Sequence, residues 1–121
     1  MIRWTICLLL LVVLGCGGGD LVDHSRDPEM FASNVKELVL TSVEDARESD
    51  EPADALWAVV HELSPGELGR QPTGPHLSLY QQLHTLASEI HEECEAVDGR
   101  APELDQRLDE LAALAEQLPD A

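Results

Sequence analysis

Apolar residues recur at helical spacing in four segments of the chain, which cover residues 28–48, 52–63, 75–97 and 102–118. A proline stands at or near the start of each segment, where its fixed φ and missing N–H suit the first turn of a helix. No run of residues alternates apolar and polar positions over the length of a strand. The pattern therefore predicts four amphipathic helices and an all-α fold.

Each predicted helix has one apolar face, and the four faces need one shared core. The residues on these faces, in chain order, are Phe31, Val35, Leu38, Val39, Ser42, Ala46, then Ala53, Leu56, Val59, Val60, Leu63, then Leu79, Leu83, Leu86, Ala87, Ile90, Cys94, Val97, then Leu104, Leu108, Leu111, Leu114, Ala115 and Leu118. We expect the aromatic residues Phe31, Trp57 and Tyr80 in or beside this core.

Short connections at 49–51 and 98–101 make neighbouring helices antiparallel. We therefore expect a small up-down-up-down four-helix bundle whose second helix is the short member. Residues 65–74 contain three glycines and two prolines, and this composition predicts a loop.

The N-terminus has the order of a secretory signal, in which a charge precedes an apolar run and a small residue. Arg3 is the sole charge before Asp20, and the apolar run from Ile6 to Leu14 closes on Gly15 and Cys16. Residues 2–14 would span roughly 20 Å as a helix, which is short of the ~30 Å hydrocarbon core of a bilayer. The pattern predicts a cleaved leader and not a transmembrane helix.

The residues Val13-Leu14-Gly15-Cys16 resemble the lipobox of bacterial lipoproteins. The resemblance covers about the first sixteen residues and implies cleavage between Gly15 and Cys16, with acyl chains such as palmitate carried on Cys16. It divides the chain into a signal peptide at 1–15, a lipidated cysteine with a flexible tether at 16–27, and a helical domain at 28–121. The alternative is an ordinary apolar leader that contains a cysteine.

As a lipoprotein, the chain would lie in the bacterial cell envelope, membrane-anchored and facing the periplasm or the exterior. Gly17 follows the cysteine where the inner-membrane retention signal of enteric bacteria has Asp, which favours the outer membrane where the organism has two. Cleavage would remove Cys7, and lipidation would use Cys16, so Cys94 would have no partner for an intramolecular disulfide.

The chain is strongly acidic, with 24 Asp and Glu against seven Lys and Arg and a net charge of −17. Loss of Arg3 with the leader would bring this charge to −18. Such a surface repels phosphate and excludes an ordinary nucleic-acid binder. Glu92, Glu93 and Glu95 stand at the negative end of the third helix, as a solvated face or as a patch for a cation or a basic protein.

Two groups of residues could carry chemistry, and the first is a partial metal site. His91 and Cys94 are surface neighbours at i and i+3, and Glu95 could supply a third ligand for a transition metal such as zinc or copper. His84 lies about 10.5 Å from His91 along the helix axis, too far to share the same ion. The alternative is a thiol packed in the core beside a flanking histidine.

The second group comes from the topology, which places Met30, His61 and His76 at one end of the bundle. Methionine and histidine are axial ligands of haem. The layout resembles the four-helix haem cytochromes of the bacterial periplasm in helix order and in a methionine near the start of the first helix. It departs from them because residues 102–118 contain no histidine and the chain has no Cys-x-x-Cys-His.

The sequence contains no Glu-x-x-His pair, no His-Glu-x-x-His, no phosphate-binding glycine loop and no Gly-x-Ser-x-Gly. We therefore expect a lipid-anchored envelope protein that is not an enzyme, binds no cofactor and acts as a structural or interaction module. The alternative is a metal- or haem-binding bundle in envelope electron transfer or metal handling. A third reading is an accessory to a cationic ligand or basic protein, whose binding would weaken between low and physiological salt.

Overall fold

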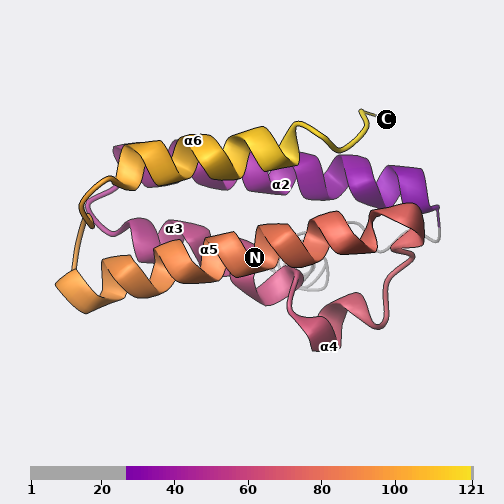
Figure 1. The fold of residues 1–121 in the computed structure, drawn as a ribbon, viewed down its shortest axis with the longest axis horizontal. Helices are drawn as coiled ribbons and strands as arrows, with labels where there is room; N and C mark the ends of the chain where they lie inside the picture. Colours follow the sequence, from indigo (N-terminus) through magenta and orange to yellow (C-terminus); the bar gives the residue numbers. More distant parts are fainter. Residues whose placement is uncertain (1–26, 121) are drawn as a thin grey trace, which may run out of the picture.

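The computed structural model describes residues 27–120. In this range the chain forms the helices α2 (Pro28–Glu48), α3 (Pro52–Glu62), α4 (Pro65–Leu68), η1 (Gly74–His76), α5 (Leu77–Val97) and α6 (Leu104–Ala115), without a strand (Figure 1). The expected all-α fold is confirmed. The predictions for the leader, for Gly15 and Cys16 and for the tether concern residues outside the described range.

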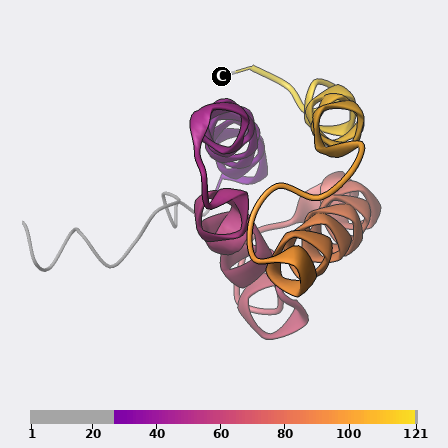
Figure 2. The same cartoon turned by 90° about the vertical axis from the view of Figure 1, so that its left-hand side faces the viewer.

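The four long helices form the expected up-down-up-down bundle. Helix α2 packs against α3 and α6, and α5 packs against the same two helices. Figure 2 shows the resulting two layers, with α2 and α6 on one side and α3 and α5 on the other. The short helix α4 lies beyond α3 and α5, on the side away from α2 and α6.

The core is built from the apolar faces that the helical periodicity predicts. Its largest fully buried side chains include Phe31, Leu56, Tyr80, Leu83, Ile90, Leu108 and Leu111. The rings of Phe31 and Tyr80 meet edge to face with their centroids 5.4 Å apart, which joins α2 to α5.

Two apolar residues lie outside the core, contrary to expectation. Trp57 is 52% exposed, because it follows buried Leu56 by one residue and therefore lies about 100° further round α3. Val97 is 51% exposed, because the chain leaves α5 directly after it through Asp98, whose φ is 53°.

The ends of the helices follow local signals at several points. Asp27 accepts a hydrogen bond from the backbone N–H of Glu29 at 3.0 Å and so caps α2. Asp98 ends α5, and the N–H of Gly99 donates to the carbonyl oxygen of Cys94 at 3.1 Å. The last helix is shorter than expected at both ends. Left-handed Glu103, with φ of 61°, delays its start to Leu104, and the helix ends at Ala115, before the turn in which the N–H of Leu118 donates to the carbonyl oxygen of Ala115.

The segment 65–74, expected as a loop, contains the helical turn α4, and the first turn of the expected third helix is the 3₁₀ turn η1. Leu68 of α4 is buried and joins the core. Gly74 has a φ of +55°, and a Cβ atom there would lie 2.9 Å from Cβ of Pro28. The segment therefore packs closely against the start of α2.

Candidate functional site

Charge is distributed unevenly along the described chain. Of the 22 Asp and Glu residues between Asp27 and Asp120, twenty lie outside residues 55–88. Within 55–88, Glu62 is only 8% exposed, and Glu67 pairs with Arg70 at 2.6 Å. We call the exposed surface of residues 55–88, from α3, α4, η1 and the first half of α5, the uncharged face. The pair of Glu67 and Arg70 on it is neutral overall.

The uncharged face contains a hollow of about 500 Å³ between the end of α3, α4 and the first half of α5. Its apolar lining includes three leucines, Leu63, Leu68 and Leu77. Its polar lining comes from amide, hydroxyl and imidazole groups, including those of Gln71, Gln81, His84 and Thr85. Because this lining contains no carboxylate, ammonium or guanidinium group, the hollow suits an uncharged group that combines apolar and hydrogen-bonding parts.

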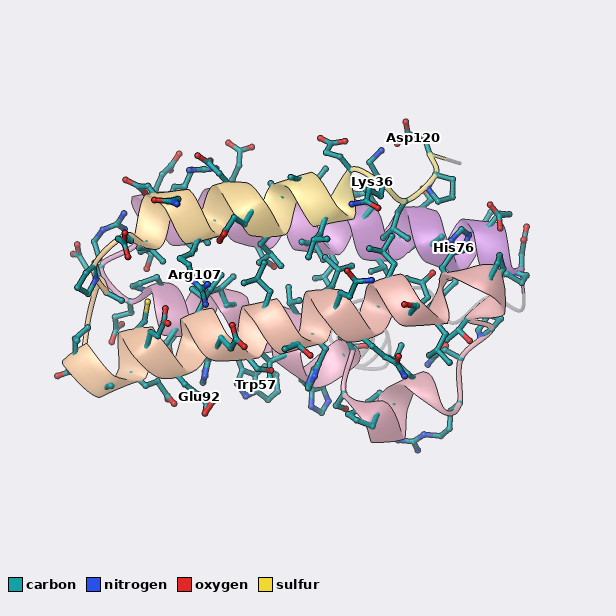
Figure 3. The ribbon with its side chains drawn as sticks, in the orientation of Figure 1. Lys36, Trp57, His76, Glu92, Arg107 and Asp120 are labelled. Atoms are coloured by element: carbon teal, nitrogen blue, oxygen red, sulfur yellow. The ribbon has the colours of Figure 1, made fainter. Side chains whose placement is uncertain are left out.

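An exposed aromatic pair also lies on the uncharged face. The indole of Trp57 stacks on the imidazole of His61, one turn further along α3, with centroids 4.8 Å apart and planes within 7°. Figure 3 shows Trp57 on the side of the bundle away from α2 and α6, where Glu92 of α5 also lies. The sequence interpretation missed this exposed tryptophan and the uncharged face, although the low number of acidic residues between Asp54 and Glu89, Glu62 and Glu67 alone, was a visible signal.

The rest of the surface is acidic, and its few cations are already paired. Each of the five Lys and Arg residues between 27 and 120 lies within ion-pair distance of a carboxylate. A hydrogen bond to Glu89 is the main cause that raises the pKa of Arg107, which bridges α6 to α5 at 3.0 Å. A hydrogen bond to Asp120 likewise raises the pKa of Lys36. These pairs leave a large excess of carboxylates on α2, α6 and the second half of α5.

The acidic residues at the end of α5 have different surroundings. Glu93 lies 3.6 Å from Arg107, and Glu95 faces His91 at 3.5 Å. Glu92 is exposed and points away from the bundle (Figure 3). The last turn of α5 contains no basic residue to offset the helix dipole.

The structure separates the residues of the predicted metal site. His91 and Glu95 face each other at the surface, while Cys94 is 1% exposed and belongs to the core. Among residues 27–120, no group of three or more His, Cys, Asp or Glu side chains is placed to hold a metal ion. His84 lines the hollow and lies 3.5 Å from the hydroxyl of Ser88.

The residues of the predicted haem site have separate neighbours. The start of α2 and η1 meet as the topology predicts, and Nε2 of His76 lies 3.1 Å from a carboxylate oxygen of Glu29. His61 stacks on Trp57 instead, and Met30 is exposed at the first turn of α2. His76 thus fastens η1 to α2, and the contacts do not join Met30, His61 and His76 into one cluster.

Comparison with known proteins gives no relative, since no family model, curated protein or solved structure matches this chain. None of the helices between residues 27 and 120 is both long and apolar enough to span a bilayer.

Proposed function

We propose that the chain is a lipid-anchored protein of the bacterial cell envelope whose helical bundle acts as a non-catalytic interaction module. The observation that carries this proposal is the motif Val13-Leu14-Gly15-Cys16 at the end of a charged and then apolar leader. Two or three acyl chains on Cys16 would hold the protein stably, because each buried methylene contributes about 0.8 kcal/mol.

The position of the helices along the chain supports an anchor that is separate from the bundle. Helix α2 begins at Pro28, twelve residues after Cys16, and the core residues identified between 27 and 120 run from Phe31 to Leu118. Three glycines directly follow Cys16, a composition typical of flexible tethers. An anchor at Cys16 therefore lies outside the stretch of chain that forms this core.

The uncharged face supports an interaction role for the bundle. A chain with a net charge of −17 keeps residues 55–88 almost free of exposed acids, and this surface contains both a hollow and a half-exposed tryptophan. A surface that is poor in carboxylates and exposes a large aromatic residue is typical of contact regions in proteins.

Intact-mass measurement of the membrane-extracted protein tests the anchor. We expect a mass that lacks residues 1–15 and includes acyl groups, and we expect the protein to fractionate with membranes. Cys16→Ser should prevent processing at this site and lipidation, whereas Cys94→Ala is the matched control and should be processed and acylated as wild type. An unprocessed or unacylated wild-type chain would overturn the proposal.

The same purified material separates the proposal from a metal- or haem-binding role. We expect no stoichiometric zinc, copper or iron by elemental analysis, and no haem absorbance. A stoichiometric metal that is lost in His91→Ala and Cys94→Ala, or a haem spectrum that is lost in His76→Ala, would favour electron transfer or metal handling instead.

A further inference from the structure

We propose that a second hollow, between the start of α3 and the end of α5, binds a lysine or arginine side chain from a basic segment of a partner protein. This inference rests on the proposed interaction role, and it deepens that role by naming the chemistry of the partner. It does not depend on the lipid anchor. Three observations carry it: the acidic lining of the hollow, a buried thiol within it and the exposed indole of Trp57.

The lining of this hollow, which we call the acidic hollow, is strongly negative. Its volume is about 140 Å³, and four carboxylates line it, those of Glu51, Asp54, Glu95 and Asp98. Helix α5 ends here without a basic residue in its last turn, so the negative end of its dipole adds to the charge. Because walls of one sign concentrate the electrostatic potential inside a hollow, this site attracts a cation.

No lysine or arginine between residues 27 and 120 pairs with a carboxylate of the acidic hollow. Arg100 is the nearest of them along the chain, but its guanidinium donates to the carbonyl oxygens of Ala46 and Ser49 instead. Glu95 faces only the imidazole of His91, at 3.5 Å. A cationic group from outside the bundle can therefore supply the missing charge.

A buried thiol also lines the acidic hollow. Cys94 is only 1% exposed, and its thiol forms no disulfide or hydrogen bond with the residues that the structure describes. Sulfur is a weak hydrogen-bond acceptor, and an ammonium or guanidinium group has several N–H donors. A metal ion fits less well, because no three His, Cys, Asp or Glu side chains between 27 and 120 are placed to coordinate one. The hollow therefore suits the head of a lysine or arginine side chain.

Trp57 extends the surface around the acidic hollow. It follows Asp54 by three residues on α3, so it lies on the same side of the helix and about 4.5 Å further along the axis. Its indole is 52% exposed, and Figure 3 shows Glu92 of α5 on the same side of the bundle. Cations bind to indole faces, and tryptophan is frequent among the residues that dominate protein interfaces. A protein segment with neighbouring side chains can use both the hollow and the indole, whereas an isolated cation cannot.

Titration with a basic peptide tests this docking. The purified protein, in neutral detergent, is titrated by calorimetry with a six-residue peptide in which arginine alternates with glycine. The control peptide has citrulline, which is uncharged and similar in shape, in place of each arginine. Sodium chloride at about 0.15 M shortens the Debye length to about 8 Å and so suppresses attraction to distant charges. We expect saturable binding of one arginine peptide per chain and no binding of the citrulline peptide.

Removal of charge locates the bound peptide. Asp54→Asn with Asp98→Asn removes two carboxylates of the acidic hollow at constant shape, and Glu37→Gln with Glu44→Gln removes the same charge from exposed positions on α2. We expect the first pair to weaken binding about tenfold and the second pair less than about twofold, because close charge pairs contribute most. Equal effects would overturn the site and would indicate attraction to the overall negative charge.

Substitution of Trp57 gives a second measurement. Because Trp57 is exposed, Trp57→Leu should fold as wild type, and we expect it to weaken peptide binding about threefold through loss of the cation–π contact. Met30→Leu, an exposed position at the start of α2, is the matched control and should leave binding unchanged. Equal binding by the Trp57 variant and wild type would overturn the contact with the indole.

Two further outcomes separate the alternatives. Argininamide that binds as tightly as the peptide would overturn the protein partner and would indicate a site for a small cation. Absence of peptide binding in a protein whose intact mass shows acylation at Cys16 would overturn this inference and leave the lipid anchor intact. An unacylated protein that binds the peptide would overturn the anchor and support the docking site.

Discussion

Tyr80 is a buried polar residue near the start of α5, and its ring and its hydroxyl have opposite effects on stability. Its ring is fully buried and packs against Phe31. Its hydroxyl is also buried and has no hydrogen-bond partner among the residues that the structure describes. Burial is the main cause that raises the pKa of this phenol, and the nearby carboxylate of Glu29 raises it further.

Removal of the Tyr80 hydroxyl should stabilise the bundle. Tyr80→Phe keeps the ring and deletes a buried donor without a partner, so we expect the free energy of unfolding to rise by about 1 kcal/mol. Urea unfolding followed by circular dichroism at neutral pH measures this change. A loss of stability would show that the hydroxyl has a favourable partner, such as a buried water.

The same residue predicts a loss of stability in alkali. Because the folded state raises the pKa of Tyr80 above its ordinary value of 10.0, the unfolded chain releases the phenol proton first as the pH rises. The contribution is fully present below pH 10.0 and declines above it. The pKa of Lys36 is also raised, first by its hydrogen bond to Asp120. The contribution of Lys36 to stability therefore declines above pH 10.5.

The free energy of unfolding, measured at about pH 8 and at about pH 11, reports this decline. Tyr80→Phe should lose less stability than wild type between the two values, because its remaining decline comes from Lys36 and other groups. An equal loss in both proteins would contradict the role of Tyr80. Absorbance of tyrosinate provides an independent readout, since Tyr80 is the single tyrosine and should ionise together with unfolding.

Single-residue environments were the least predictable part of the candidate sites. The spacing of His91, Cys94 and Glu95 correctly makes them neighbours on one helix, but it does not say which of them the adjacent helices cover. Trp57 is the converse case, because an aromatic residue in an apolar helix suggests burial. Both outcomes depend on where α2, α5 and α6 lie around the residue.

At the scale of elements, helical periodicity was sufficient for the four long helices and their order. The apolar positions of each face could be counted from the sequence, and short connections fixed the antiparallel arrangement. The segment 65–74 could not be predicted in this way. Its path depends on the burial of Leu68 and on the approach of Gly74 to Pro28, which is a contact between residues far apart in the chain.

Gly74→Ala should therefore destabilise the protein. The φ of +55° is unfavourable for alanine, and the new Cβ would lie 2.9 Å from Cβ of Pro28, so we expect a loss of about 1–2 kcal/mol. Gly66→Ala is the matched control, because no heavy atom lies within 4 Å of its added Cβ. Chemical denaturation compares the two, and an equal effect would contradict a specific requirement at Gly74.

At the scale of the whole molecule, repulsion between carboxylates opposes folding. The described ion pairs are largely exposed, and exposed pairs typically contribute 0 to about 1 kcal/mol each. They do not offset an excess of 17 negative charges over residues 27–120. The composition predicted this excess, and the sequence also shows that only two of the 22 acidic residues between 27 and 120 fall within residues 55–88.

Sodium chloride should stabilise the protein. Screening shortens the reach of the repulsion, with a Debye length that falls from about 30 Å at 0.01 M to about 10 Å at 0.1 M, so we expect the urea midpoint to rise over this range. Potassium chloride is the control and should give the same rise, because screening depends on ionic strength. A midpoint that falls with salt would mean that the ion pairs outweigh the repulsion.

The burial of Cys94 determines when its sulfur can react. Closed inside the folded bundle, the thiol is shielded from oxidants and from neighbouring chains, even in a compartment that forms disulfides. A chain that is still unfolded presents the same thiol to solvent and can cross-link to another copy. For an exported chain, folding would therefore compete with covalent dimerisation through Cys94, and the native packing would protect the sulfur once the bundle has formed.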